Sequence, residues 1–97
     1  MLEVMVVDEN GAVQSEVVAF PAELLHAEHD ASSICLRFVD PYGDAVFNRL
    51  QMHVMQDELT RCERAAHGLH AEVFAAIRSM CHRVQAKQHL YLKFVGD

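Results

Sequence analysis

The chain has 97 residues, 52% of them hydrophobic, and a formal net charge of −6. This length supports one hydrophobic core, so we predict a single domain over residues 1–97. No apolar run approaches the roughly 20 residues of a membrane-spanning helix, and the first residues lack the basic start of an export signal. The three cysteines show no close pairing, which is typical of reduced thiols, and we therefore expect a cytoplasmic protein.

Charge is distributed unevenly along the chain. The first 36 residues contain no lysine or arginine, and all eight basic residues lie from Arg37 onward. The acidic residues of this first part are Glu3, Asp8, Glu9, Glu16, Glu23, Glu28 and Asp30. An acidic surface repels phosphate groups, which argues against nucleic acids and anionic membranes as partners, whereas it suits a basic protein. The alternative is an ordinary solvated surface.

The N-terminal part predicts a hairpin followed by a short helix. Residues 2–7 are rich in valine, residues 8–11 end in the Asn-Gly pair typical of tight turns, and residues 12–20 would return as the second strand. Pro21 is favoured in the first turn of a helix, where Glu23 also meets the positive end of the helix dipole. We therefore predict a short helix or helical turn over residues 21–29.

The segment 34–50 predicts a second hairpin. Apolar side chains alternate along residues 34–39 and predict one strand, residues 45–49 predict the other, and the turn at residues 40–43 contains Pro41 and Gly43. Residues 90–95 repeat the same alternation and predict the last strand. We expect four side chains of these strands to share the core face of one sheet, namely Leu36, Phe38, Leu92 and Phe94.

Between the second hairpin and the last strand the apolar period changes to about 3.6, which predicts helices. One rod over residues 53–88 would be about 54 Å long, too long for a chain expected to have a radius of gyration of about 13 Å. Gly68 is the predicted break, and Thr60 within a capping-box pattern is the alternative. The order is ββ(α)ββααβ, an α+β domain in which a helical hairpin covers one face of a mainly antiparallel sheet of about five strands.

The candidates for catalysis are His53, Cys81 and His82. A helical hairpin bent at Gly68 would bring His53 level with the other two, and a Cys–His pair is the minimum for thiol catalysis. No orienting third group is recognisable, and the sequence contains no phosphate loop, dinucleotide fingerprint, serine elbow or metalloprotease helix. The alternative is that Cys81 is a small buried apolar residue.

The candidate metal ligands are Asp8, Asp40 and Asp44. If the two hairpins share a sheet and a direction, their turns lie side by side, and clustered carboxylates could hold calcium or magnesium. Turns also contain aspartate because its side chain caps them. We expect no cofactor.

The sheet face away from the helices would carry aromatic and basic side chains beside aliphatic ones, a composition that protein interfaces favour. The candidate binding residues on it are Arg37, Phe47, Arg49, Tyr91 and Lys93. The favoured hypothesis is a small protein-interaction or regulatory module without catalysis, which binds a protein partner through its acidic N-terminal surface or associates with itself. The alternatives are a small enzyme or ligand-binding protein with a pocket between helices and sheet, and a metal-binding domain.

Overall fold

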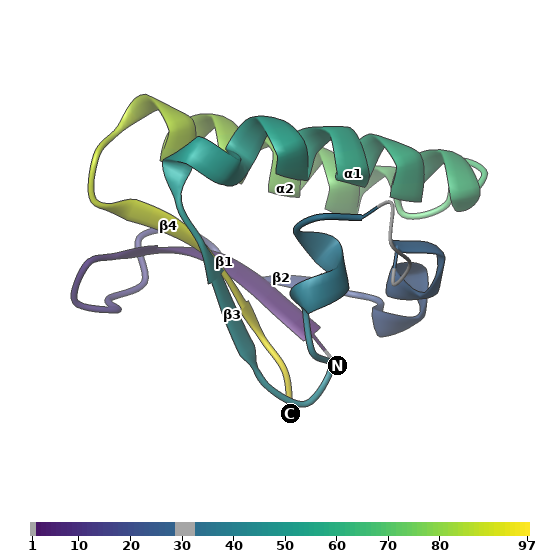
Figure 1. Cartoon of the computed structure of the whole chain (residues 1–97), viewed down its shortest axis with the longest axis horizontal. Coiled ribbons are helices and arrows are strands. Elements are labelled where there is room, and N and C mark those ends of the chain that lie inside the picture. The colour runs from purple at the N-terminus through teal and green to yellow at the C-terminus, as the bar shows by residue number, and fades with distance from the viewer. Residues whose placement is uncertain (1, 29–32) are drawn as a thin grey trace.

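The computed structural model describes residues 2–28 and 33–97 of the chain. Within this part, the strands β1 (Leu2–Asp8), β2 (Val18–Phe20), β3 (Asp44–Phe47) and β4 (Leu90–Val95) form one antiparallel sheet in the order β2-β1-β4-β3. Two α-helices, α1 (Met52–Ala65) and α2 (Ala71–Ala86), and three 3-10 helices, η1 (Ala22–Glu28), η2 (Leu36–Phe38) and η3 (Arg49–Gln51), complete the domain (Figure 1). The α+β class is confirmed, although this sheet has four strands instead of about five.

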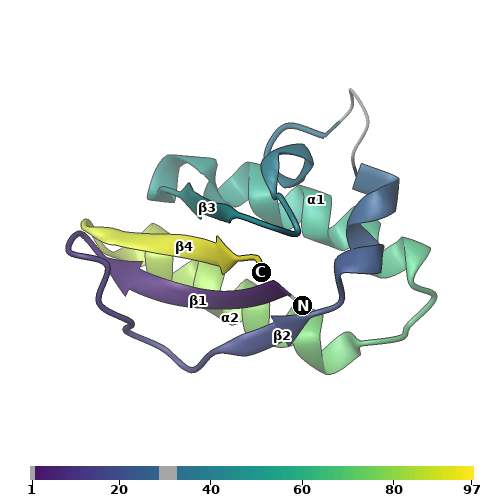
Figure 2. The ribbon, with the colours of Figure 1, turned by 90° about the horizontal axis from the view of Figure 1, so that it is seen from below.

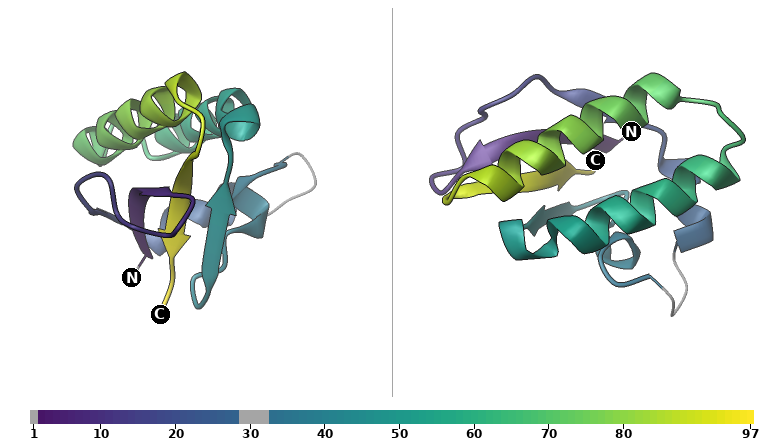
Figure 3. Two further views of the ribbon diagram at one scale, coloured as in Figure 1. Left: turned by 90° about the vertical axis from the view of Figure 1, so that its left-hand side faces the viewer. Right: turned by 90° about the horizontal axis from the view of Figure 1, so that it is seen from above.

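The two α-helices form an antiparallel hairpin on one face of the sheet (Figure 3). Helix α2 contacts β1, β2 and β4, while α1 lies beside α2 and contacts η1 and η3. The chain reverses at Gly68, whose φ is +84°, so the predicted break is confirmed. A break near Thr60 is wrong, because Thr60 lies inside α1 and its hydroxyl donates to the Gln56 carbonyl. None of the helices in the described part combines the length and apolar character that crossing a membrane requires.

Phenylalanine rings connect the sheet with the helices. Phe20 of β2 makes edge-to-face contacts with Phe74 of α2 and Phe94 of β4, at centroid distances of 6.0 and 6.2 Å. Phe47 of β3 meets Phe94 in the same way at 5.9 Å. Such pairs contribute about 0.5–1.5 kcal/mol beyond their buried area. The aromatic chain therefore ties both edges of the sheet to its centre.

The N-terminal hairpin differs from the prediction in its second strand. The turn forms with Gly11 at a φ of +83°, but the return strand is reduced to β2 and one isolated bridge between Val7 and Val13. The reason is local, since the Val6 N–H donates to the Ser15 hydroxyl at 2.8 Å and not to a backbone carbonyl. The helical turn predicted after Pro21 is present as η1, and the end predicted at His29 lies outside the described residues.

The central hairpin is the main error of the sequence analysis. Residues 34–39 do not form a strand: the chain bends there into η2, and β3 pairs with β4 instead. Leu36 is fully buried as expected, but Phe38 is 63% exposed. The cause is Glu58 of α1, whose carboxylate accepts the backbone N–H groups of residues 34, 35 and 36. A strand needs those donors for its ladder.

Candidate functional site

No described helix covers the sheet face opposite α1 and α2 (Figure 2). Leu2, Val4 and Val6 of β1 point into the core, as do Leu92 and Phe94 of β4. Because side chains alternate along a strand, the residues between them point to the other side. We define the open face as the outward-pointing residues of β1, β4 and β3, namely Glu3, Met5, Val7, Tyr91, Lys93, Val95, Asp44 and Val46.

The open face carries Lys93 at its centre, apolar and aromatic side chains around it, and the acids Glu3 and Asp44 at one end. Strand register places Lys93 between Met5 and Val46, and Tyr91 beside Val7. Met5 and Val7 on this face are only 7% and 3% exposed. The Lys93 ammonium lies 3.7 Å from the Asp44 carboxylate. The accessible surface therefore combines the Val46 side chain, the Tyr91 ring and the Lys93 stem with the exposed acids Glu3 and Asp44.

Two shallow hollows meet at Tyr91. One, of about 250 Å³, is lined by Val7, Asp8, Glu9, Gly11, Val46, Tyr91 and Lys93. The other, of about 130 Å³, is lined by Asn48, Arg49, Leu50, His89, Leu90 and Tyr91. His89 Nδ1 and Glu9 Oε2 are 2.8 Å apart, which joins the β1 turn to the start of β4. Tyr91 therefore separates an acidic hollow from one that carries arginine and histidine.

The predicted binding residues divide into two groups. Tyr91 and Lys93 lie on the open face, and Arg49 lines the hollow beside Tyr91. Phe47 instead points into the core, because its register partner is the inward-facing Leu92. Arg37 is on η2, away from the sheet, where its guanidinium stacks on the Phe38 ring at 4.8 Å.

The structure does not provide an accessible thiol beside the candidate histidines. Cys81 is fully buried, whereas His53 and His82 are exposed. Burial raises the pKa of the Cys81 thiol to about 12, although nearby Arg78 acts in the opposite direction. Since the thiolate is the nucleophile, Cys81 is almost entirely in its unreactive form at neutral pH.

The expected acidic cluster is not formed. Asp8 is paired with Leu90 at one end of β4, and Asp44 is paired with Val95 at the other end. Strands β1 and β3 run in the same direction, so the end of one and the start of the other lie about 17 Å apart along the sheet. Asp40 precedes Asp44 and lies at that same far end. Among the described residues, no three His, Cys, Asp or Glu side chains are grouped so that they could hold a metal ion.

The sequence analysis missed Glu58, which is only 1% exposed. Its Oε1 accepts from the Ser33 hydroxyl and the Leu36 N–H, both at 2.8 Å, and its Oε2 accepts from the Ile34 N–H at 3.0 Å. The Cys35 N–H is 3.1 Å from both oxygens. Desolvation raises the pKa of Glu58, but these hydrogen bonds outweigh it and hold the pKa below its ordinary value.

The helical period contained a signal for this burial. Glu58 follows Met55 by three residues and precedes Cys62 by four, so it lies on the apolar stripe of α1. A charged residue on an apolar stripe is a candidate for a buried, fully hydrogen-bonded group.

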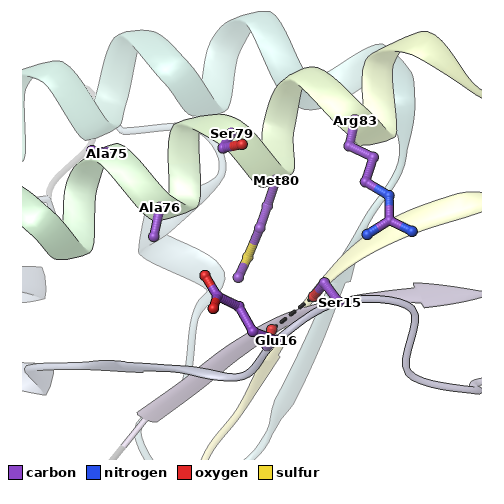
Figure 4. A pocket seen from close by; sticks show the side chains of 7 residues that line it. All are labelled: Ser15, Glu16, Ala75, Ala76, Ser79, Met80 and Arg83. Atoms are coloured by element: carbon purple, nitrogen blue, oxygen red, sulfur yellow. Dashed lines mark hydrogen bonds between the residues drawn. The ribbon is translucent and has the colours of Figure 1, made fainter.

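A further hollow, of about 440 Å³, lies between α2 and residues 15–16 (Figure 4). Met80 points into it, and the small side chains of Ala75, Ala76 and Ser79 form the helix wall. The Ser15 hydroxyl already donates to the Glu16 carbonyl at 2.7 Å. Glu16 and Arg83 are exposed at the rim. The hollow is a surface depression in which the Ser15 hydroxyl is already bonded to the backbone.

Comparison of the chain with protein-family models, with curated proteins and with solved structures gives no match. The open face and the sheet edges are the features of the molecule that bear on its function.

Proposed function

We propose that the chain is a small protein-interaction or regulatory module without catalysis, whose open face binds a basic protein. The observation that carries this proposal is the open face itself, a surface across three strands with apolar, aromatic and charged side chains. No described helix covers it (Figure 2). Aromatic, aliphatic and basic side chains gather there around Tyr91. Tyrosine and arginine are the residues that most often dominate binding energy at protein interfaces.

Charge supports a basic partner. The acids on or beside the open face are Glu3, Asp8, Glu9 and Asp44, and the bases are Arg49 and Lys93. Asp44 already neutralises Lys93, which leaves three acids against Arg49. Such an imbalance steers oppositely charged partners toward the surface and makes association dependent on salt.

Two observations disfavour small-molecule binding beside Tyr91 and catalysis by Cys81. The hollows beside Tyr91, at about 250 and 130 Å³, are smaller than the 300–1,000 Å³ typical of small-molecule sites. The thiol of Cys81 is buried and protonated. We further propose a cytoplasmic location, since all three cysteines are free, as a reducing compartment would keep them.

Affinity capture from a cell extract, analysed by mass spectrometry, tests this proposal. We expect the wild-type chain to retain basic proteins at low salt and to release them as the salt concentration rises. Tyr91→Ala removes the central ring and Glu3→Lys reverses an exposed charge on the open face. Both variants should retain much less of the same proteins.

The matched control is Asp57→Lys, which makes a similar charge change on exposed helix α1, in the opposite layer. It should capture the same proteins as the wild type. Capture that is independent of salt, or that Asp57→Lys weakens as much as Glu3→Lys does, would show that the open face is not the binding surface.

A further inference from the structure

The two edges of the sheet are protected to different degrees. At one edge, β2 has only three residues, the preceding ladder is interrupted at Ser15, and Pro21 follows. Interrupted ladders, short strands and proline are the features that prevent edges from pairing with other strands. At the other edge, β3 pairs with β4 in regular register over all four of its residues. It contains neither proline nor a bulge.

The outward-facing backbone groups of β3 can be identified. The Gly96 N–H donates to the Gly43 carbonyl at 2.8 Å, so the next hydrogen-bonded pairs with β4 are at Ala45 and Phe47, because bonding alternates along an antiparallel ladder. The N–H and C=O of Val46 therefore point away from β4, toward the side where the sheet order places no further strand of the described chain. The Asn48 N–H is already bonded to the Gln51 side chain at 2.8 Å.

Apolar side chains are exposed at both ends of this edge as well as at its centre. Val46 is 54% exposed, Tyr42 in the preceding turn is 82% exposed, and Leu50 in η3 is 67% exposed. Tyr42 precedes Val46 by four residues, and Leu50 follows Val46 by four. An edge with this pattern is complementary to itself when a second copy approaches in the antiparallel direction.

We propose that two copies of the chain pair through β3, with Val46 opposite Val46 of the second copy on a twofold axis. The two Val46 residues exchange both of their outward hydrogen bonds, and their side chains pack together. In this register Asp44 opposes Asn48 of the second copy, and Tyr42 approaches Leu50 of the second copy. The interface is isologous, because each copy presents the same patch.

This pairing joins the two sheets into one and makes the two open faces continuous. The contact is short, so we expect a dissociation constant in the micromolar range or weaker, and a dimer that forms with increasing concentration. The inference concerns an edge of the sheet and does not depend on the basic partner proposed above.

Disulfide trapping tests the register. In a hydrogen-bonded antiparallel pair the Cα atoms are about 5.5 Å apart, which a disulfide can span. Val46→Cys should therefore form a covalent dimer under mild oxidation. Asp44→Cys should do so at least about tenfold more slowly, since the two Asp44 positions would be about 14 Å apart. The native cysteines are all buried and do not compete.

Sedimentation equilibrium tests the interface without a new thiol. Val46→Pro removes the outward N–H, and edge strands tolerate proline at such a position. Val46→Lys places a charge on the edge. Both variants should be monomeric at concentrations where the wild type dimerises. Val17→Lys is the control, because Val17 is 47% exposed and lies before β2; it should still dimerise.

A wild type that stays monomeric at millimolar concentration, or equal crosslinking at residues 44 and 46, would overturn the proposal. Tyr91→Ala and Glu3→Lys lie outside the β3 edge, so variants of this kind that lose the basic proteins but still dimerise would separate this proposal from the proposed function.

Discussion

At the scale of single residues, the carboxylate of Glu58 determines the conformation of a segment more than twenty positions away. It binds three consecutive backbone N–H groups and the Ser33 hydroxyl. We expect Glu58→Gln to lower the free energy of unfolding by about 1–3 kcal/mol. The amide N–H₂ of glutamine is itself a donor, so it cannot accept the hydrogen bond that a buried backbone N–H donates to the carboxylate. Urea denaturation would measure the change. Asp57→Asn, the same replacement at an exposed neighbour, should change it by less than about 0.5 kcal/mol.

The effect of Glu58 should depend on pH. A carboxyl whose pKa is lower in the folded state than in the unfolded state stabilises the fold above the unfolded value, which is about 4.3. This contribution is lost as pH falls through the lower folded pKa. The stability difference between wild type and Glu58→Gln should be constant near neutral pH and should shrink below about pH 4. A difference that persists at more acidic pH would show that the charge of Glu58 is not its source.

The buried thiols give a second prediction at this scale. Desolvation raises the pKa of Cys35 to about 11, with a smaller contribution from the Glu58 charge, and burial raises the pKa of Cys81 to about 12. At pH 8 the thiolate fraction of Cys35 is then about one in a thousand, whereas an ordinary cysteine is about one quarter ionised. A disulfide reagent such as Ellman's should therefore label the native chain at least about a hundredfold more slowly than the chain in urea. Rapid labelling of the native protein would show that the core opens readily.

At the scale of elements, local patterns predicted what local forces determine. The helical hairpin and its break at Gly68 follow from apolar periodicity and from one residue that tolerates positive φ. The strand predicted at residues 34–39 did not form because the deciding partner, Glu58, lies in another element. Of the residues buried there, Leu36 and Val39 are three apart, as in a 3-10 helix. For the candidate site, alternation placed Tyr91 and Lys93 correctly. Phe47 was misplaced because its face depends on pairing with β4, which is not encoded locally.

The contact between the last strand and the turn at residues 40–43 gives a prediction at this scale. A Cβ at Gly96 would lie 2.5 Å from the Pro41 carbonyl oxygen. The turn backbone at Pro41 cannot move without disturbing the hydrogen bond from the Gly96 N–H to the Gly43 carbonyl. Gly96→Ala should therefore lower the free energy of unfolding by about 1–3 kcal/mol, measured by urea denaturation.

Gly43→Ala is the matched control for Gly96→Ala. Its Cβ would meet only the Asp40 carboxylate, at 3.2 Å, and this side chain can rotate. The expected cost is below about 1 kcal/mol. Equal losses in the two variants would mean that the turn and the end of β4 are not in close contact.

At the scale of the whole molecule, stability should decrease from the centre of the sheet to its edges. Strands β1 and β4 each have a neighbouring strand on both sides and lie under α2. Because hydrogen-bonded pairs alternate along an antiparallel ladder, the N–H groups of Met5 and Lys93 point toward each other's strand and bond between β1 and β4. Such amides exchange only when most of the fold opens, so their opening free energy should approach that of global unfolding.

Hydrogen exchange followed by NMR would test this order and connect it with self-association. In dilute protein, the amides of Met5 and Lys93 should exchange slowest. The Phe94 amide should exchange at an intermediate rate, because it is bonded toward the edge strand β3. The Val46 amide should exchange fast, because its N–H points away from β4. Raising the protein concentration should slow exchange at Val46, because its N–H gains a hydrogen-bond partner in the dimer. Exchange at Met5 should slow by no larger a factor, because dimerisation acts on it only by stabilising the folded state. Slow exchange at Val46 in the most dilute sample would contradict a β3 edge that is free in the monomer.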